Sequence, residues 1–235
     1  MNLTSKIYSY IKITRPINVI ITFSVVVVAI LISQTESTDF YVILFASIAA
    51  ALVTAAGNIV NDIFDIDTDK ISHQDRVLVL GKISKKESWI EYLLLNGISF
   101  IISVSLSIKL MLIALTTIIL LYIYSSTLKK LPLIGNLTIA FLTGLAFIYG
   151  GLAVGNPMSA IVPAVFAFLI NFIREIVKDM QDIEGDKTLG VITFPIKFGF
   201  QKSKILILII TVSLILYTLY PFIIELYKIE YFMIV

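Results

Sequence analysis

The sequence predicts an all-α fold, a polytopic bundle of about seven membrane-spanning helices with a cytoplasmic N-terminus. Hydrophobic residues make up 58% of the 235 residues and charged residues only 14%. A soluble chain of this length could not bury so much apolar surface, so lipid is the expected solvent for most of it. Apolar runs close to the ~20 residues that cross a bilayer as a helix occur at roughly 17–33, 40–60, 89–107, 110–126, 133–153, 158–177 and 203–220.

The charge distribution supports this division. With the N-terminus inside, the cytoplasmic segments, taken with their edges, are 1–16, 61–88, 127–132 and 178–202. They hold all eighteen basic residues except Lys109 and Lys228, which is the asymmetry expected of cytoplasmic loops. The first run has no small-residue cleavage site after it, so it is predicted to be a span and not a signal peptide. The sequence therefore predicts a multi-pass cell-membrane protein whose polar motifs face the cytoplasm.

Composition also excludes several kinds of site. The chain has no cysteine, which rules out disulfides, thiolate metal sites and a cysteine nucleophile. A net charge of +2 gives no support to nucleic-acid binding. One domain over 1–235 is expected. Residues 231–235 resemble the first turns of a further helix, so this end either packs at the membrane interface or belongs to spans that the sequence lacks.

Two clusters of aspartates share one spacing. The steps i, i+3 and i+7 occur twice, and a lysine follows each cluster directly. The members are Asp62, Asp65 and Asp69, and then Asp179, Asp182 and Asp186. On a helix this spacing puts the three carboxylates of a cluster on one face. Clustered oxygen ligands without His or Cys suit Mg²⁺, which commonly shares its coordination shell with substrate phosphates. The sequence thus predicts Mg²⁺ between two facing clusters.

The two clusters differ in how strongly they argue for function. Asn58, Asn61 and Asp62 lie within or at the edge of an apolar stretch, where polar groups are costly unless they face a cavity or a partner. The second cluster alternates with cations, so on its own it could equally form exposed i, i+4 ion pairs. The functional interpretation of the second cluster is stronger because its spacing repeats that of the first cluster half a chain later. The repeat also suggests a bundle built from two similar halves.

Basic and hydroxyl side chains accompany the carboxylates. A polyphosphate needs cations beside its metal ligands, because Arg and Lys neutralise the charge that the metal does not. The candidates to bind substrate are Arg15, Arg76, Tyr124, Lys129, Arg174 and Lys178, with Asn58 and Asn61 from the first cluster. For any single lysine, ordinary positive-inside bias remains an alternative interpretation.

These features favour a substrate with a diphosphate head and a long hydrocarbon tail. Mg²⁺ can stabilise a departing diphosphate, and an apolar bundle excludes the water that would capture an allylic carbocation. The chain shows no Ser/His arrangement, and such chemistry requires no strong nucleophile.

The motifs resemble those of the UbiA superfamily of intramembrane prenyltransferases. Asn61-x-x-x-Asp65-x-x-x-Asp69 is similar to the first signature of that family, and Asp182-x-x-x-Asp186 is similar to the second. The sequence departs from the family pattern at Val77, where proline is usual. Within the superfamily, the chain most resembles the archaeal enzymes that transfer a geranylgeranyl group from its diphosphate to geranylgeranylglyceryl phosphate, forming the second ether bond of archaeal membrane lipids.

The resemblance implies roles for the residues above. It implies nine spans, Mg²⁺, both lipid substrates and contact with membrane lipids. Asp65, Asp69, Asp182 and Asp186 would be catalytic, and they would hold metal and diphosphate together with Asn61, Asp62 and Asp179. Arg76 and Lys178 would contact phosphate, and Tyr124 and Lys129 fall near a Tyr/Lys motif of the family. For a phosphorylated acceptor, Arg15, Lys12 and Arg174 are candidate ligands.

Two alternatives stay open. The same fold and motifs could serve an aromatic acceptor, such as a hydroxybenzoate, a naphthoate or a porphyrin. A cation transporter could use the same aspartates, although it would place polar residues deep inside several spans. The first, fourth and seventh apolar runs carry little beyond Ser, Thr and Tyr, which counts against a transporter.

Overall fold

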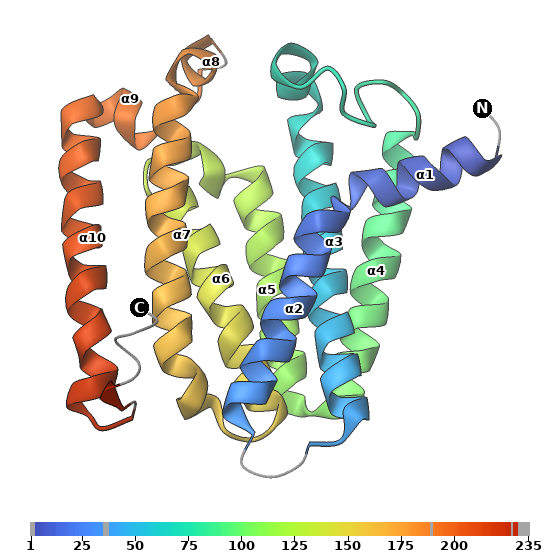
Figure 1. The fold of residues 1–235 in the computed structure, drawn as a ribbon. Helices are drawn as coiled ribbons and strands as arrows, with labels where there is room; N and C mark the ends of the chain where they lie inside the picture. The colour runs from blue at the N-terminus through green and yellow to red at the C-terminus, as the bar shows by residue number, and fades with distance from the viewer. Residues whose placement is uncertain (1–2, 35–37, 189, 227, 230–235) are drawn as a thin grey trace. The chain divides into compact units, whose positions relative to one another are not determined.

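The computed structural model describes residues 3–34, 38–188, 190–226 and 228–229, and their regular secondary structure is entirely helical (Figure 1). Among these residues, seven helices are long and apolar enough to cross a membrane, which confirms the predicted span count. They are α2 (Pro16–Ser33), α3 (Phe40–Ser72), α4 (Lys85–Leu106), α5 (Ile108–Ser126), α6 (Ile134–Ala153), η2 (Pro157–Ala160) with α7 (Ile161–Gln181), and α10 (Phe200–Ile223). The shorter helices are α1 (Leu3–Ile13), η1 (Leu128–Lys130), α8 (Ile183–Thr188) and α9 (Phe194–Phe198). The predicted start of a further helix at 231–235 lies outside the described residues.

The chain divides into two compact units. Unit 1 comprises Met1–Lys129 and Leu145–Ile161, and unit 2 comprises Lys130–Gly144 and Val162–Val235. The first aspartate cluster belongs to unit 1 and the second to unit 2. A single domain over 1–235 stays a prediction.

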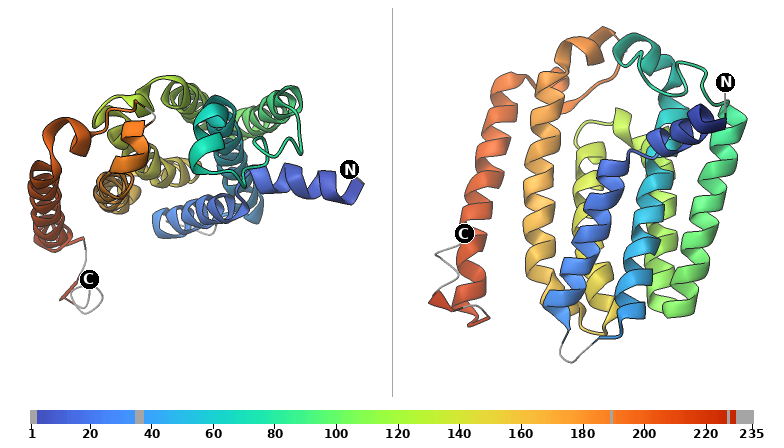
Figure 2. Two further views of the ribbon diagram at one scale, coloured as in Figure 1. Left: turned by 90° about the horizontal axis from the view of Figure 1, so that it is seen from above. Right: turned by 45° about the vertical axis from the view of Figure 1, so that its right-hand side comes forward.

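Unit 1 is organised around α3, which packs against α2, α4 and α5 (Figure 2). Small side chains of α3 are buried, including Ala49, Ala55 and Ala56, and small residues let helix backbones approach closely in a membrane. The Ser99 hydroxyl of α4 donates a hydrogen bond to the Ala49 carbonyl at 2.8 Å. Packing against these three helices positions the polar motif at the end of α3.

The second half of α6 also belongs to unit 1. Gly150 lies directly against α2: an added Cβ would be 2.5 Å from the Ala29 Cβ and 3.0 Å from the Val26 carbonyl oxygen. The Tyr149 and Ser103 hydroxyls are 3.1 Å apart and hydrogen-bonded inside the unit. Glycine is therefore required at 150 for close helix contact.

Unit 2 has a separate hydrophobic core. Ala140 of α6, Phe172 and Ile176 of α7, and Ile210 of α10 are buried together. Within the same unit, the Asn171 amide donates to the Thr143 hydroxyl at 2.8 Å, linking α7 to α6. This core packs along α7, the helix that carries Asp179 of the second aspartate cluster near its C-terminal end.

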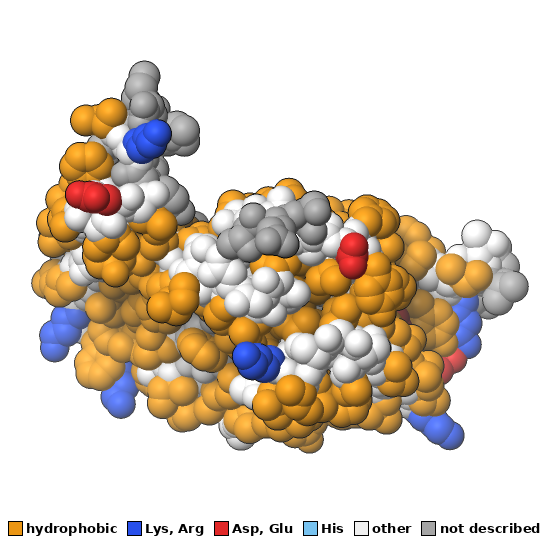
Figure 3. Space-filling view, turned by 90° about the horizontal axis from the view of Figure 1, so that it is seen from below, with side chains coloured by type: hydrophobic (Ala, Val, Ile, Leu, Met, Phe, Trp, Pro, Cys, Tyr) orange, Lys and Arg blue, Asp and Glu red, His pale blue; other side chains and the backbone are white. Residues whose placement is uncertain are grey.

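Apolar side chains also cover the outside of the molecule. Figure 3 shows hydrophobic side chains over most of the visible face and only scattered charges. On α10, for example, Leu208, Ile215 and Leu216 are each more than half exposed. Such a surface is stable only in lipid, so the protein is a multi-pass membrane protein.

The helices depart from the expected spans in three places. The second apolar run was expected to end near residue 60, but α3 continues without interruption to Ser72. The N-terminal helix α1 was not predicted. The second aspartate cluster does not lie on one continuous helix, because α7 ends at Gln181 and α8 begins at Ile183, which leaves Asp182 at a bend. Gly185 and the aspartates around the bend are poor helix formers, which accounts for it.

We predict that Gly150→Ala destabilises the protein by about 1–3 kcal/mol, because the new methyl group has no room against α2. Gly97→Ala is the matched control. A Cβ at position 97 of α4 meets no atom within 4 Å, so the control should be neutral or stabilising by up to about 1 kcal/mol. Thermal unfolding followed by circular dichroism in detergent would compare the two, and equal melting temperatures would contradict the packing described for α6.

Candidate functional site

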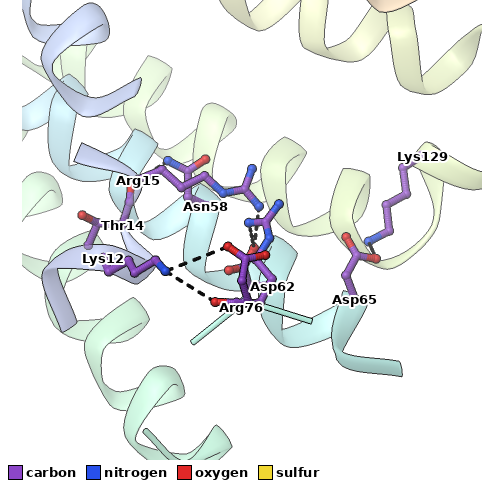
Figure 4. A network of polar contacts seen from close by, with 9 residues as sticks. Lys12, Thr14, Arg15, Asn58, Asp62, Asp65, Arg76 and Lys129 are labelled. Atoms are coloured by element: carbon purple, nitrogen blue, oxygen red, sulfur yellow. Dashed lines mark hydrogen bonds and ion pairs between the residues drawn. The ribbon is translucent and has the colours of Figure 1, made fainter. Parts of the chain in front are cut away.

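The polar end of α3 carries a buried carboxylate that is bound by two arginines. The Asp62 side chain is only 3% exposed, and its Oδ1 accepts hydrogen bonds from Arg15 Nη2 at 2.5 Å and from Arg76 Nη1 at 3.0 Å (Figure 4). The arginine side chains are 31% and 26% exposed. Two cations on one anion leave net positive charge at this point, so the group can attract a further anion.

Arg15 is held by the turn between α1 and α2. Its backbone is left-handed, with φ 53° and ψ 74°, which is an uncommon conformation for a side-chain-bearing residue. The following Pro16 disfavours the right-handed helical region for Arg15. The Asn58 amide donates to the Thr14 carbonyl at 2.8 Å, which ties the turn to α3. The sequence thus fixes Arg15 through a proline, an asparagine and an aspartate.

Arg76 comes from the loop after α3. The loop is anchored because Val77 and Leu78 are buried in a hydrophobic cluster with Ile59 and Ile63 of α3. Valine at 77, where the family usually has proline, therefore fills the core beneath the loop. This burial positions Arg76 toward Asp62.

A third cation reaches the cluster from the segment after α5. Lys129 of η1 forms an ion pair with Asp65 in which both side chains are largely buried. Figure 4 shows Asp65 and Lys129 beside the Asp62 group. Tyr124, at the end of α5, is half-buried. The structure thus brings Arg15, Asn58, Asp62, Asp65, Arg76 and Lys129 together within unit 1.

Asp69 differs from the other two carboxylates. It is 6% exposed, yet no side chain in the described part of unit 1 gives it a hydrogen bond or an ion pair. Asn61 is half-buried on the same helix. A buried carboxylate without a bonding partner is costly, so Asp69 is suited to accept a cation.

No group of three or more His, Asp or Glu side chains converges on a ready-made metal site among the described residues. Mg²⁺ usually needs only one or two carboxylates, with substrate phosphates and water completing its shell. The oxygen-only donors Asp65 and Asp69, with Asn61 nearby in sequence, fit that requirement. The metal roles of the six aspartates stay predictions.

In unit 2 the second cluster has different partners. The Asn136 amide of α6 donates to Asp179 Oδ2 at 2.9 Å, and Asn136 is 8% exposed. Asn136 is not among the site residues predicted from the sequence. Its position near the start of an apolar run, where a polar side chain is costly without a partner, was the signal that could have identified it.

The other residues of the second cluster lie nearer to water. Arg174 pairs with Glu175 at 2.8 Å, and its side chain is 70% exposed. Asp182 and Lys178 are exposed as well. Burial raises the pKa of the Asp186 carboxyl from its usual value, and the neighbouring Asp182 charge adds to the rise. Arg174 therefore makes a local pair, and its predicted substrate contact stays a prediction.

Comparison with known proteins identifies the family of the chain. The model of the UbiA prenyltransferase family matches residues 22–235. The chain belongs to the UbiA prenyltransferase family. It is accordingly a prenyltransferase, and the recognition made from the paired aspartate motifs is confirmed.

Individual relatives agree with this assignment. The chain is 37% identical to digeranylgeranylglyceryl phosphate synthase of Methanothermobacter thermautotrophicus over 84% of this chain and 69% of that protein. It is 37% identical to the enzyme of the same name from Methanococcus aeolicus over 99% of this chain and 82% of that protein. A solved structure of digeranylgeranylglyceryl phosphate synthase in membranes superposes with a TM-score of 0.86 at 34% identity, covering 97% of this chain and 81% of that one.

A more distant structure supports the fold. The UbiA homologue from Archaeoglobus fulgidus bound to DMAPP and Mg²⁺ is 20% identical, with a TM-score of 0.76 over 96% of this chain and 81% of that one.

We predict that Asp62→Asn destabilises the protein by roughly 2–3 kcal/mol, below the ~3–5 kcal/mol of a fully buried broken pair because both guanidinium groups are partly exposed. Asp67→Asn is the matched control: Asp67 pairs with Lys70 on the surface of the same helix and is 94% exposed, so its loss should leave the melting temperature almost unchanged. Thermal unfolding of both variants would test the difference. A smaller loss at 62 than at 67 would contradict the described pairing.

We predict that Asn136→Ala costs more stability than Asn171→Ala. Both asparagines donate one hydrogen bond between α6 and α7, but Asn136 donates to a carboxylate and Asn171 to a hydroxyl. A bond to a charged group contributes about 1.5–3 kcal/mol and a neutral one about 0.5–1.5 kcal/mol. Unfolding midpoints measured in the same detergent would rank the variants, and the reverse order would show that Asp179 does not hold Asn136 as described.

Proposed function

We propose that this protein transfers a geranylgeranyl group from geranylgeranyl diphosphate to geranylgeranylglyceryl phosphate with the aid of Mg²⁺. The reaction forms the second ether bond of archaeal membrane lipids. The observation that carries the proposal is the polar end of α3, where cations from three separate segments pair with two of its carboxylates. Relatives named digeranylgeranylglyceryl phosphate synthase, at 33–37% identity, support the choice of acceptor.

The charges at the end of α3 suit a metal diphosphate. Asp65 and Asp69 would hold metal in unit 1, and Asp182 and Asp186 would do so in unit 2. Bound Mg²⁺ would act as a Lewis acid on the diphosphate oxygens. Arg76 and Lys129 already lie beside the α3 carboxylates, so diphosphate oxygens could replace the carboxylates as their partners.

The remaining chemistry requires little from the protein. The C–O bond between the allylic carbon and the diphosphate breaks, and the acceptor hydroxyl oxygen forms the new ether bond to that carbon. The hydroxyl proton passes to the departing diphosphate or to a neighbouring carboxylate. The apolar helices around the site exclude water that would otherwise capture the allylic cation.

The acceptor phosphate needs cations of its own. We propose Arg15 for this role, because it is fixed beside Asp62 and its buried Nε has no hydrogen-bond partner among the described residues. Arg174 and Lys178 are the candidates in unit 2, since both are exposed. We also propose that this end of the protein faces the cytoplasm, as the positions of the basic residues predict.

Neither alternative has equal support. A phosphate acceptor carries more negative charge than an aromatic acid and so makes fuller use of the additional cations, and the relatives are named digeranylgeranylglyceryl phosphate synthases. A cation transporter is disfavoured by membership of a prenyltransferase family.

We predict that purified protein converts radiolabelled geranylgeranyl diphosphate and geranylgeranylglyceryl phosphate into the diether phosphate only when Mg²⁺ is present. Removal of Mg²⁺ with a chelator should abolish the product, because the leaving group then loses its divalent counter-charge. Asp65→Asn and Asp182→Asn should each lower the rate by at least about 100-fold, roughly the ~3 kcal/mol expected when one stabiliser of the transition-state charge is lost.

Asp67→Asn and Glu184→Gln provide controls. Each lies in the same polar segment as a proposed ligand, and each removes one carboxylate charge outside the i, i+3, i+7 set. Both should stay within about threefold of the wild-type rate. A product formed from hydroxybenzoate instead would overturn the acceptor, and full activity in both Asp65→Asn and Asp182→Asn would overturn the metal roles.

A further inference from the structure

A second charged feature of unit 1 lies outside the proposed catalytic residues. Where α1 meets the start of α4, a pocket of about 600 Å³ opens beside the loop that connects α3 to α4. Lys6, Lys82 and Lys85 line it together with Ser84, Gly81 and Glu87, over apolar side chains of Ile66, Leu78 and Ile83. None of the aspartates or arginines described above lines the pocket, although Ile66 lies between Asp65 and Asp69 in the sequence of α3.

The pocket carries uncompensated positive charge. Its one carboxylate, Glu87, is bound by the Lys6 ammonium at 2.5 Å and by the Ser84 backbone N–H at 2.7 Å. Lys82 and Lys85 are exposed, and neither ammonium makes a hydrogen bond or ion pair within the described ranges. The nearby Asp67 is taken by Lys70 at 2.7 Å. Two lysines therefore remain available to an anion.

The start of α4 does not itself supply the binding groups. The Ser84 hydroxyl accepts from the Glu87 N–H at 3.2 Å, and the Glu87 side chain accepts from the Ser84 N–H. This capping box satisfies the backbone donors that an anion would otherwise use. Recognition in this pocket must come from the lysine side chains.

The pocket lies beside a helix suited to the membrane interface. Figure 1 shows α1 crossing the end of α4 at a steep angle to the spanning helices. Ile7, Tyr8 and Ile11 form an exposed apolar face on α1, with exposed fractions of 51%, 63% and 53%. A short helix with an apolar face and lysines beside it lies in the plane of the lipid headgroups. A helix placed in this way would put the pocket at the depth of lipid phosphates.

We propose that this pocket binds the phosphate headgroup of an anionic membrane lipid. Lys82 and Lys85 bind the phosphate oxygens, and Ile66, Leu78 and Ile83 contact the apolar part of the lipid next to the headgroup. A basic pocket at the end of membrane helices is typical of such recognition. A lipid bound there joins α1 to the start of α4 and so steadies the turn that presents Arg15.

The test compares lipid binding to the purified full chain by native mass spectrometry. Dioleoyl phosphatidate is the probe, and dioleoyl phosphatidylcholine has the same chains without net charge. Each lysine near an anionic lipid surface is worth about fivefold in affinity, so Lys82→Ala/Lys85→Ala should weaken phosphatidate binding about 25-fold and leave phosphatidylcholine unchanged.

Lys202→Ala/Lys204→Ala is the matched control, since it removes two exposed lysines at the start of another spanning helix, α10. It should bind phosphatidate as the wild type does. Lys82→Arg/Lys85→Arg should retain binding, which separates loss of charge from misfolding. The proposal is overturned if the control pair loses as much affinity as Lys82→Ala/Lys85→Ala. It is also overturned if inorganic phosphate displaces the lipid at equal concentration, because the site would then recognise a free anion.

Discussion

The ion pairs of Asp62 hold the polar end of unit 1 in place. A carboxylate at the end of an apolar membrane helix is costly unless cations surround it. Arg15 and Arg76 supply these cations. Arg15 precedes α3 in the sequence, in the α1–α2 turn, and Arg76 follows α3, in the loop after Ser72. The turn and the loop are thereby fixed to α3. Arg15 and Arg76, two of the cations proposed to bind phosphate, depend on this one buried anion.

The three carboxylates of the first cluster have different surroundings despite their regular spacing. Asp62 is bound by arginines, Asp65 by Lys129, and Asp69 is buried with no bonding partner among the described side chains. We therefore propose Asp69 and Asp65 as the first candidates for metal binding in this cluster. Asp62 acts first as the residue that positions Arg15 and Arg76. The lysine pocket at the start of α4 would bind phosphate separately from this cluster, because none of the three aspartates lines it.

Much of this arrangement could be predicted from the sequence. Apolar runs of the right length gave the seven spans, because a helix is the simplest way to satisfy the backbone in lipid. The i, i+3, i+7 spacing predicted one helical face for the first cluster, and α3 confirms it by continuing to Ser72. The amphipathic helix α1 was missed, although the spacing of Ile7 and Ile11 carried the signal.

The partners of the charged residues could not be predicted. Arg15 and Asp62 are 47 residues apart, and their meeting depends on how a turn folds back onto α3. The break at Asp182 depends on weak local preferences near Gly185, which spacing alone does not reveal. Asn136 was overlooked because a single amide at the edge of a span has no motif around it. Its role follows only from the hydrogen bond to Asp179.

Binding of geranylgeranyl thiolodiphosphate, which cannot react readily, tests the central claim most directly. Isothermal calorimetry should show that the wild-type protein binds it only with Mg²⁺, and that Asp69→Asn and Asp186→Asn each weaken binding by at least about tenfold. Asp67→Asn should bind as the wild type does. Unchanged, Mg²⁺-independent binding in both variants would contradict the account, because the diphosphate would then be held by the cations alone.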